Sequence, residues 1–137
     1  MARQDRKCGI IKLDNTSFNL YNLSRDYVLE GVYYFVDEKG VNPVKEFIHS
    51  LPPKEQTKVY AYINELKIKG WNLRRPMADY LSEDIYELRP RYNRIFYFFY
   101  LGNRAILVHA IKKRSKEIPS GDLQLCIKRK MAIERDI

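Results

Sequence analysis

The chain has 137 residues, a length that suits one domain with one hydrophobic core and makes a second independent core unexpected. Its formal net charge of +8 creates a positive field, so nucleic acid, the ribosome surface and anionic membranes are the candidate polyanionic partners. A hydrophobic content of 45% excludes wholesale disorder, and two cysteines with only two histidines argue against a disulfide framework, a zinc motif or a histidine-based metal site.

The N-terminal part of the sequence differs from the rest. Residues 1–27 mix loop-forming Asn, Ser and Thr with isolated apolar residues, so we interpret them as an extension that packs on the body of the domain or on a partner. Within it, residues 8–13 favour a short strand but are too short for a signal-peptide core. With no apolar segment of transmembrane length, we expect a cytoplasmic protein without membrane contact, whose main domain is residues 28–137.

The first half of this domain predicts one strand and two helices. Residues 28–36 are rich in β-branched and aromatic residues and predict a strand. Asn42 is the expected N-cap of a helix over residues 43–51, with proline at its first position. A second helix is predicted over residues 53–69 and ends at Gly70. We expect the two helices to form a hairpin that packs on a sheet.

The second half predicts mostly strands. Residues 71–84 show no regular pattern and are interpreted as irregular. Strands over residues 85–91, 94–101 and 104–113 follow, and the short loops between them indicate an antiparallel meander. A last helix is predicted after Pro119, with Ser120 as its N-cap. The order β-α-α-β-β-β-α indicates an α+β fold in which helices cover one face of the sheet and leave the other face free to bind.

Basic and aromatic residues alternate along the run of residues 85–114. Alternation along the strands predicts an exposed face that carries Glu87, Arg89, Arg94, His109 and Lys113, with Lys112 able to reach the same patch. The side chains expected to face the helices instead are Leu88, Ile95, Phe99, Val108 and Ala110. A basic patch with aromatic neighbours on one strand surface favours contact with nucleic acid.

Such a cluster suits RNA cleavage without a metal, in which the 2′-hydroxyl attacks the phosphorus atom. Fixed guanidinium and ammonium groups stabilise the charge that develops on the phosphoryl oxygens. Glu87, His109 or a lysine of lowered pKa are candidates for the acid and base, and the aromatic residues offer stacking surfaces for unpaired bases.

Each candidate also has a purely structural interpretation. Glu87 can form an ion pair with Arg89 or Arg94, His109 can be a packed histidine, and the aromatic stripe of residues 96–100 belongs to the core by default. The convergence of arginines and Lys113 on one predicted face is what favours phosphate chemistry.

Several motifs resemble those of a known family. Residues 85–91, Ile-Tyr-Glu-Leu-Arg-Pro-Arg, with 93–99, Asn-Arg-Ile-Phe-Tyr-Phe-Phe, resemble the "YELR…YR" core of phage-derived Gp49-like proteins, the HigB-type toxins. Residues 107–114, followed by a proline, are similar to the family segment "LLHGFxKK…TP", with Ala-Ile in place of Gly-Phe. Residues 42–47 are similar to the opening of its first helix. The resemblance covers roughly residues 32–131.

This resemblance implies a RelE/ParE-like fold and the toxin of a type II toxin–antitoxin pair. The expected activity is mRNA endonuclease activity at the ribosome, without a cofactor. A helix-turn-helix antitoxin of the HigA type would neutralise the toxin and carry the pair to operator DNA. Two alternatives stay open: a ParE-like gyrase poison, and a non-catalytic RNA- or partner-binding module.

The resemblance also implies which residues matter. The positions that match its functional residues are Glu87, Arg89, Arg94, Lys112 and Lys113. Three further cations are expected to bind RNA, namely Arg91, Arg114 and Lys116. The Tyr or His that some relatives carry near the C-terminal end has no counterpart, because Pro119 and Ser120 occupy that region.

Overall fold

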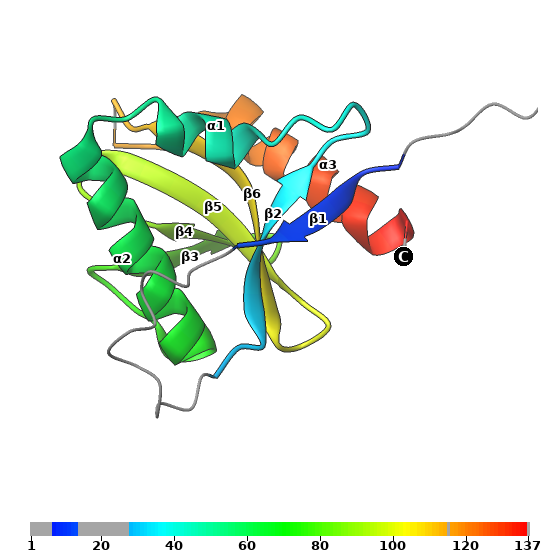
Figure 1. Ribbon diagram of the computed structural model, residues 1–137, viewed down its shortest axis with the longest axis horizontal. Helices are drawn as coiled ribbons and strands as arrows, with labels where there is room; N and C mark the ends of the chain where they lie inside the picture. The colour runs from blue at the N-terminus through cyan, green and yellow to red at the C-terminus, as the bar shows by residue number, and fades with distance from the viewer. Residues whose placement is uncertain (1–6, 14–27, 115, 137) are drawn as a thin grey trace, which may run out of the picture.

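The computed structural model describes residues 7–13, 28–114 and 116–136. The described strands form one six-stranded sheet in the order β1-β2-β6-β5-β4-β3. Figure 1 shows the sheet together with the helices that pack on it. In chain order, the elements are β1 (Gly9–Lys12), β2 (Gly31–Val36), α1 (Pro43–His49), α2 (Pro53–Lys69), the 3-10 turn η2 (Gly70–Asn72), β3 (Ala78–Ser82), β4 (Ile85–Leu88), β5 (Asn93–Tyr100), β6 (Arg104–Lys112) and α3 (Ser120–Asp136). The predicted α+β, RelE-like fold is confirmed.

The N-terminal strand predicted over residues 8–13 is confirmed as β1, which pairs antiparallel with β2. β2 in turn pairs parallel with β6, so it lies between the first strand and one of the last. Glu30, just before β2, links β1 to β6, because its carboxylate accepts hydrogen bonds from Lys12 at 2.8 Å and from Arg104 at 2.8 Å. The remainder of the predicted extension lies outside the described residues, and the division at residue 27 stays a prediction.

β2 begins at Gly31, three residues later than predicted. The residues before it serve the end of α2 instead: the amides of Val28 and Leu29 donate to the carbonyls of Ile68 and Lys67. These carbonyls belong to the last turn of a helix and have no partner within it. The segment before β2 is therefore held against α2 rather than paired in the sheet.

The two-helix hairpin is confirmed, and so are its start and end signals. The Asn42 side chain accepts from the Lys45 amide at 3.1 Å, which caps α1. Gly70 ends α2 with φ 53°, and a Cβ at this position would lie 2.7 Å from a methyl group of Val28. Glycine is required here on both counts, because its backbone is left-handed and the neighbouring chain passes close by.

The prediction that residues 71–84 are irregular is wrong in part, because this segment contains η2 and the edge strand β3. β3 pairs antiparallel with β4, with a shift in register between Tyr80 and Ser82. Its hydrophobic pattern is weak because one of its long sides faces solvent, and Tyr80 is 50% exposed. Glu83 and Asp84 form the tight turn to β4 with φ 52° and 63°, so no glycine marks the hairpin in the sequence.

The predicted meander is confirmed as β4, β5 and β6, with small changes in its bounds. β4 ends at Leu88 rather than at residue 91, β5 begins at Asn93, and β6 ends at Lys112. Phe96 pairs with His109 and Tyr97 with Leu107, which leaves Val108 as the extra residue of a β-bulge. Val108 therefore packs against the α3 side of the sheet, and its predicted orientation toward the helical hairpin is wrong.

The second face of the sheet was expected to be free, and this is wrong. On one face, apolar residues of α1 and α2, including Ile48 and Leu66, pack on Ile95 and Tyr97. On the opposite face, Cys126 and Ile133 of α3 pack on Phe96, Phe98 and Ile106 of the sheet. The aromatic residues of β5 alternate between both faces, so both faces need apolar cover. α3 begins at Ser120 itself, one residue earlier than an N-cap at this position would allow.

Candidate functional site

A cluster of one carboxylate and two guanidinium groups lies on the α3 face of the sheet. Arg89 Nη1 lies 2.6 Å from Glu87 Oε2, and Arg94 Nε lies 3.7 Å from Glu87 Oε1. Glu87 is 2% exposed and Arg94 is 7% exposed. The three residues do share one face, as predicted, but the prediction of an exposed face is wrong for Glu87 and Arg94. Strand alternation predicts the face of the sheet on which a side chain lies, but it does not predict how deeply that side chain is buried.

Arg94 is held rigidly by the turn that precedes it. Its Nη1 donates to the carbonyls of Arg91 at 2.7 Å and Asn93 at 2.9 Å. Arg91 sits at φ 59°, and the Asn93 amide closes the turn onto Pro90. Burial lowers the pKa of Arg94 below its usual value, and Arg89 adds to this effect while Glu87 opposes it. Guanidinium groups nevertheless stay charged in proteins, so the cluster presents a fixed cation.

A basic hollow of about 360 Å³ opens beside Arg94. It is lined by Tyr92, Arg94, Lys113, Arg114 and Lys116. The Lys113 amide donates to the Tyr92 carbonyl at 2.7 Å, which places the end of β6 against the turn before β5. Tyr92 is 68% exposed, so an aromatic ring stands in solvent among four cations. The structure thus brings together four of the predicted residues, namely Arg94, Lys113, Arg114 and Lys116.

His109 lies on the same face, one register step from Arg94, because Arg94 pairs with Ile111 and Phe96 pairs with His109. Its Nε2 lies 2.7 Å from Asp122 Oδ1, in the first turn of α3. The imidazole stacks on the Phe96 ring at 5.8 Å between centroids. The contact between His109 and Asp122 joins the sheet to α3, and the other ring nitrogen, Nδ1, takes no part in it.

Two of the predicted residues lie elsewhere. Lys112 does not reach the patch: its Nζ lies 3.1 Å from Glu55 Oε1 at the start of α2, on the opposite side of the sheet. Asn93 donates to the same carboxylate, and these two contacts lower the pKa of Glu55. Arg91 is exposed but is not part of the hollow, and its charge acts on Glu55. The one-residue step between Lys112 and Lys113 sends them to opposite faces, as strand geometry requires.

Tyr92 and Asp122 were missed as candidates by the sequence analysis. Tyr92 lies in the turn between β4 and β5, and an aromatic residue between Arg91 and Arg94 in the sequence is a usable signal for a stacking surface. Asp122 lies in the first turn of α3, and no local sequence signal pairs it with a histidine on β6. The arrangement can hold a phosphate at the cations, stack a base on Tyr92 and exchange a proton at His109.

Within the residues that the structure describes, no group of three His, Cys, Asp or Glu side chains is placed to hold a metal ion. Over the same described ranges, no helix is long and apolar enough to cross a membrane.

Comparison with known families places these features in context. A family model described as "Phage derived protein Gp49-like (DUF891)" matches residues 46–131, more than half of the chain. The matched span includes strands β3 to β6, the cluster of Glu87, Arg89 and Arg94, and every residue that lines the basic hollow. A comparison with curated proteins found no match. Gp49-like proteins are toxin-like modules of the RelE and HigB type, which act with an antitoxin partner. The chain belongs to the Gp49-like family of phage-derived proteins.

Proposed function

We propose that the chain is the toxin of a type II toxin–antitoxin system and cleaves mRNA as a metal-independent endoribonuclease. The observation that carries this proposal is the fixed, buried guanidinium of Arg94 at the edge of a hollow ringed by lysines and an exposed tyrosine. A cation held in place before the reaction stabilises developing negative charge without a cost of reorganisation. The net charge of +8 favours association with RNA and with the ribosome in the cytoplasm.

In this proposal, the RNA phosphate lies against Arg94 and Lys113. The 2′-oxygen attacks phosphorus as its proton leaves to a base, and the bond to the 5′-oxygen breaks as that oxygen gains a proton. The products are a 2′,3′-cyclic phosphate and a free 5′-hydroxyl. Arg94 and Lys113 stabilise the phosphoryl oxygens, and Tyr92 stacks on a neighbouring base.

We assign both proton transfers to His109, whose Nε2 is held by Asp122: the imidazole takes the proton of the 2′-hydroxyl and then gives it to the departing 5′-oxygen. Glu87 is a positioning residue in this proposal, because it is buried and paired with Arg89 at 2.6 Å. Arg114 and Lys116 bind the RNA backbone along the rim of the hollow. A helix-turn-helix antitoxin neutralises the enzyme and supplies the contact with operator DNA.

Two adjacent lysines make a matched test. Lys113→Ala removes a cation from the hollow, whereas Lys112→Ala removes one from the opposite face. After induction of each variant, primer extension on total mRNA maps new 5′ ends. We expect Lys113→Ala to reduce cleavage by about 100-fold, in the range of losing one charge-stabilising group, and Lys112→Ala to cleave as the wild type does.

Three outcomes distinguish the candidate functions. Equal cleavage by the two variants would place the active site elsewhere. Growth arrest with no new 5′ ends, but with DNA breaks that depend on gyrase, would support the ParE-like alternative. Purified protein that binds RNA with a steep salt dependence and never cleaves it would support the non-catalytic alternative.

A further inference from the structure

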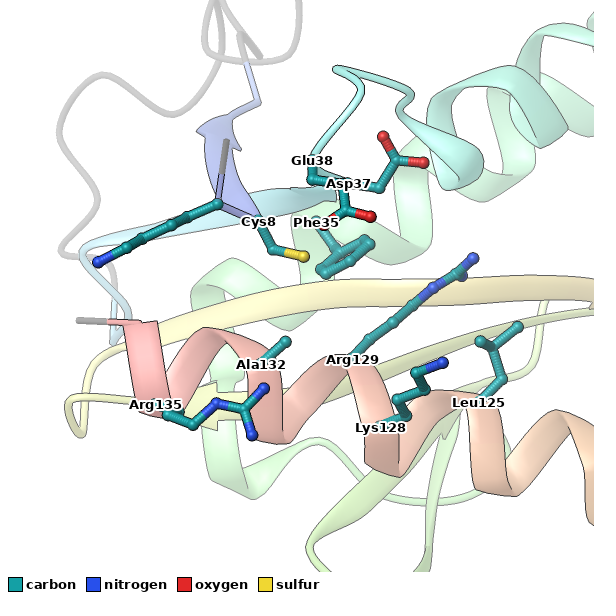
Figure 2. A pocket seen from close by; sticks show the side chains of 10 residues that line it. Cys8, Phe35, Asp37, Glu38, Leu125, Lys128, Arg129, Ala132 and Arg135 are labelled. Atoms are coloured by element: carbon teal, nitrogen blue, oxygen red, sulfur yellow. The ribbon is translucent and has the colours of Figure 1, made fainter. Parts of the chain in front are cut away.

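A second hollow, of about 380 Å³, lies between β2 and the C-terminal half of α3. Figure 2 shows the Cys8 thiol and the Phe35 ring on the strand side, with Ala132, Lys128 and Arg135 of α3 on the other side. None of its lining residues lines the basic hollow beside Arg94. The proposed RNA site therefore does not account for it.

The α3 side of this hollow is a regular stripe. Leu125, Lys128, Ala132 and Arg135 follow one another at spacings of three, four and three, which places them on one face of a helix. Ala132 lies in the middle, where its small side chain allows another segment to approach the helix closely. Leu125 and the Phe35 ring add apolar surface. An amphipathic helix binds to a protein by laying its apolar face into an apolar groove, and the groove here has a cation on either side of Ala132.

The charges around the hollow are unbalanced. Lys128 and Arg135 form no ion pair and no hydrogen bond with any residue in the described part of the chain. The two acids that line the hollow, Asp37 and Glu38, are outnumbered by its cations, because Lys7 and Arg129 line it together with Lys128 and Arg135. Lys128 and Arg135, two helical turns apart, therefore have no carboxylate partner within the part of the chain that the structure describes.

Arg129 is committed to the fold itself. Its Nη1 donates to the Val108 carbonyl at 2.7 Å, and its guanidinium lies over the Phe35 ring at 5.1 Å. Burial lowers its pKa below the usual value. Arg129 lines the hollow, but these contacts within the fold make it less available to an incoming partner than Lys128 and Arg135 are.

We propose that this hollow binds an acidic amphipathic helix of the antitoxin. An apolar side chain of that helix enters between Phe35 and Ala132, and its carboxylates pair with Lys128 and Arg135. The inference rests on the toxin–antitoxin assignment and adds the place and the chemistry of the contact. Charge complementarity selects an acidic partner, and the spacing of the stripe selects a helix.

Cys8 provides a direct test, since its thiol lines the hollow. The probe is the purified helix-turn-helix antitoxin of the proposed pair, and the measurement is the rate at which iodoacetamide alkylates each cysteine, read by mass spectrometry. Cys126 is an internal control, because it is fully buried and burial raises its pKa to about 12. We expect antitoxin to slow alkylation of Cys8 at least tenfold. Unchanged alkylation of Cys8 in the complex would overturn the proposal.

Charge reversal gives an independent measurement. We expect Lys128→Glu with Arg135→Glu to weaken antitoxin binding by at least 30-fold in calorimetry. The matched control is Lys45→Glu with Lys54→Glu, which reverses two exposed charges on α1 and α2. Affinity within twofold of the wild type for the first pair, or an equal loss for the control pair, would refute the site. Neither measurement depends on RNA cleavage. If the chain fails to cleave mRNA, the proposed activity is refuted, but the binding of the antitoxin at this hollow can still be measured.

Discussion

Arg94→Ala is expected to destabilise the fold as well as to abolish the proposed activity, because the substitution leaves the buried carboxylate of Glu87 without one of its two cationic partners. Glu87 is 2% exposed, and its Oε1 has no hydrogen-bond partner within the described part of the chain and faces Arg94 Nε at 3.7 Å. Removing one partner of a buried ion pair typically costs about 3–5 kcal/mol. Arg89 still neutralises the other oxygen of Glu87, so we expect a loss near the lower end, about 3 kcal/mol.

Adding Glu87→Gln to Arg94→Ala removes the stranded charge. The double variant is then expected to recover about 1–2 kcal/mol relative to the sum of the two single losses, which is the coupling energy of the pair. Urea unfolding of the four proteins, followed by circular dichroism, measures this cycle. A loss below about 1 kcal/mol for Arg94→Ala, or additive losses, would refute the reasoning. If the loss is as expected, loss of toxicity in Arg94→Ala alone says little about catalysis, and Lys113→Ala is the cleaner variant.

Three further predictions address other parts of the molecule. Hydrogen bonds from Lys12 and Tyr33 lower the pKa of Glu30 from 4.5 to about 2, so its contribution is present above pH 4.5 and is lost as the pH falls toward 2. Because Glu30 is partly solvent-screened, we expect Glu30→Gln to cost only about 1 kcal/mol at neutral pH and nothing at the acid end; an equal cost at both ends of a pH series of urea melts would contradict this. Ile133→Ala, at a fully buried position of α3, should cost about 2–5 kcal/mol in the same assay, and a cost under about 1 kcal/mol would mean that α3 does not cover the sheet. Tyr92→Ala should leave stability within about 0.5 kcal/mol while weakening RNA binding by about 1–3 kcal/mol, measured by fluorescence anisotropy; unchanged binding would remove Tyr92 from the site.

Local signals in the sequence were sufficient for the elements whose ends are marked by specific residues. Asn42 and Gly70 bound the helical hairpin as predicted, because caps and left-handed glycines act within a few residues. β3 lacked such signals: its turn uses Glu83 and Asp84 in place of glycine, and one of its long sides faces water.

The remaining differences arise from tertiary structure. Sequence alternation placed Glu87, Arg94 and Lys113 on one face correctly, but the depth of the first two depends on α3 and the turn before β5. The bulge at Val108 changes the alternation of side chains within β6, and the residue types around it do not predict a bulge. The pairing of His109 with Asp122 joins a strand to a later helix, so only the folded chain brings the two side chains together.

The parallel pairing of β2 with β6 has a consequence for the chain as it leaves the ribosome. β2 emerges early, yet its neighbour in the sheet is among the last strands to be made, as Figure 1 shows by their colours. Contacts of this range form late, after a large loss of chain entropy. A translation product that stops before β6 keeps β1 as a partner of β2 but has no strand to join β2 to β5, and it lacks the Lys113 that lines the hollow with Arg94. Premature termination before β6 therefore yields a fragment without the basic hollow.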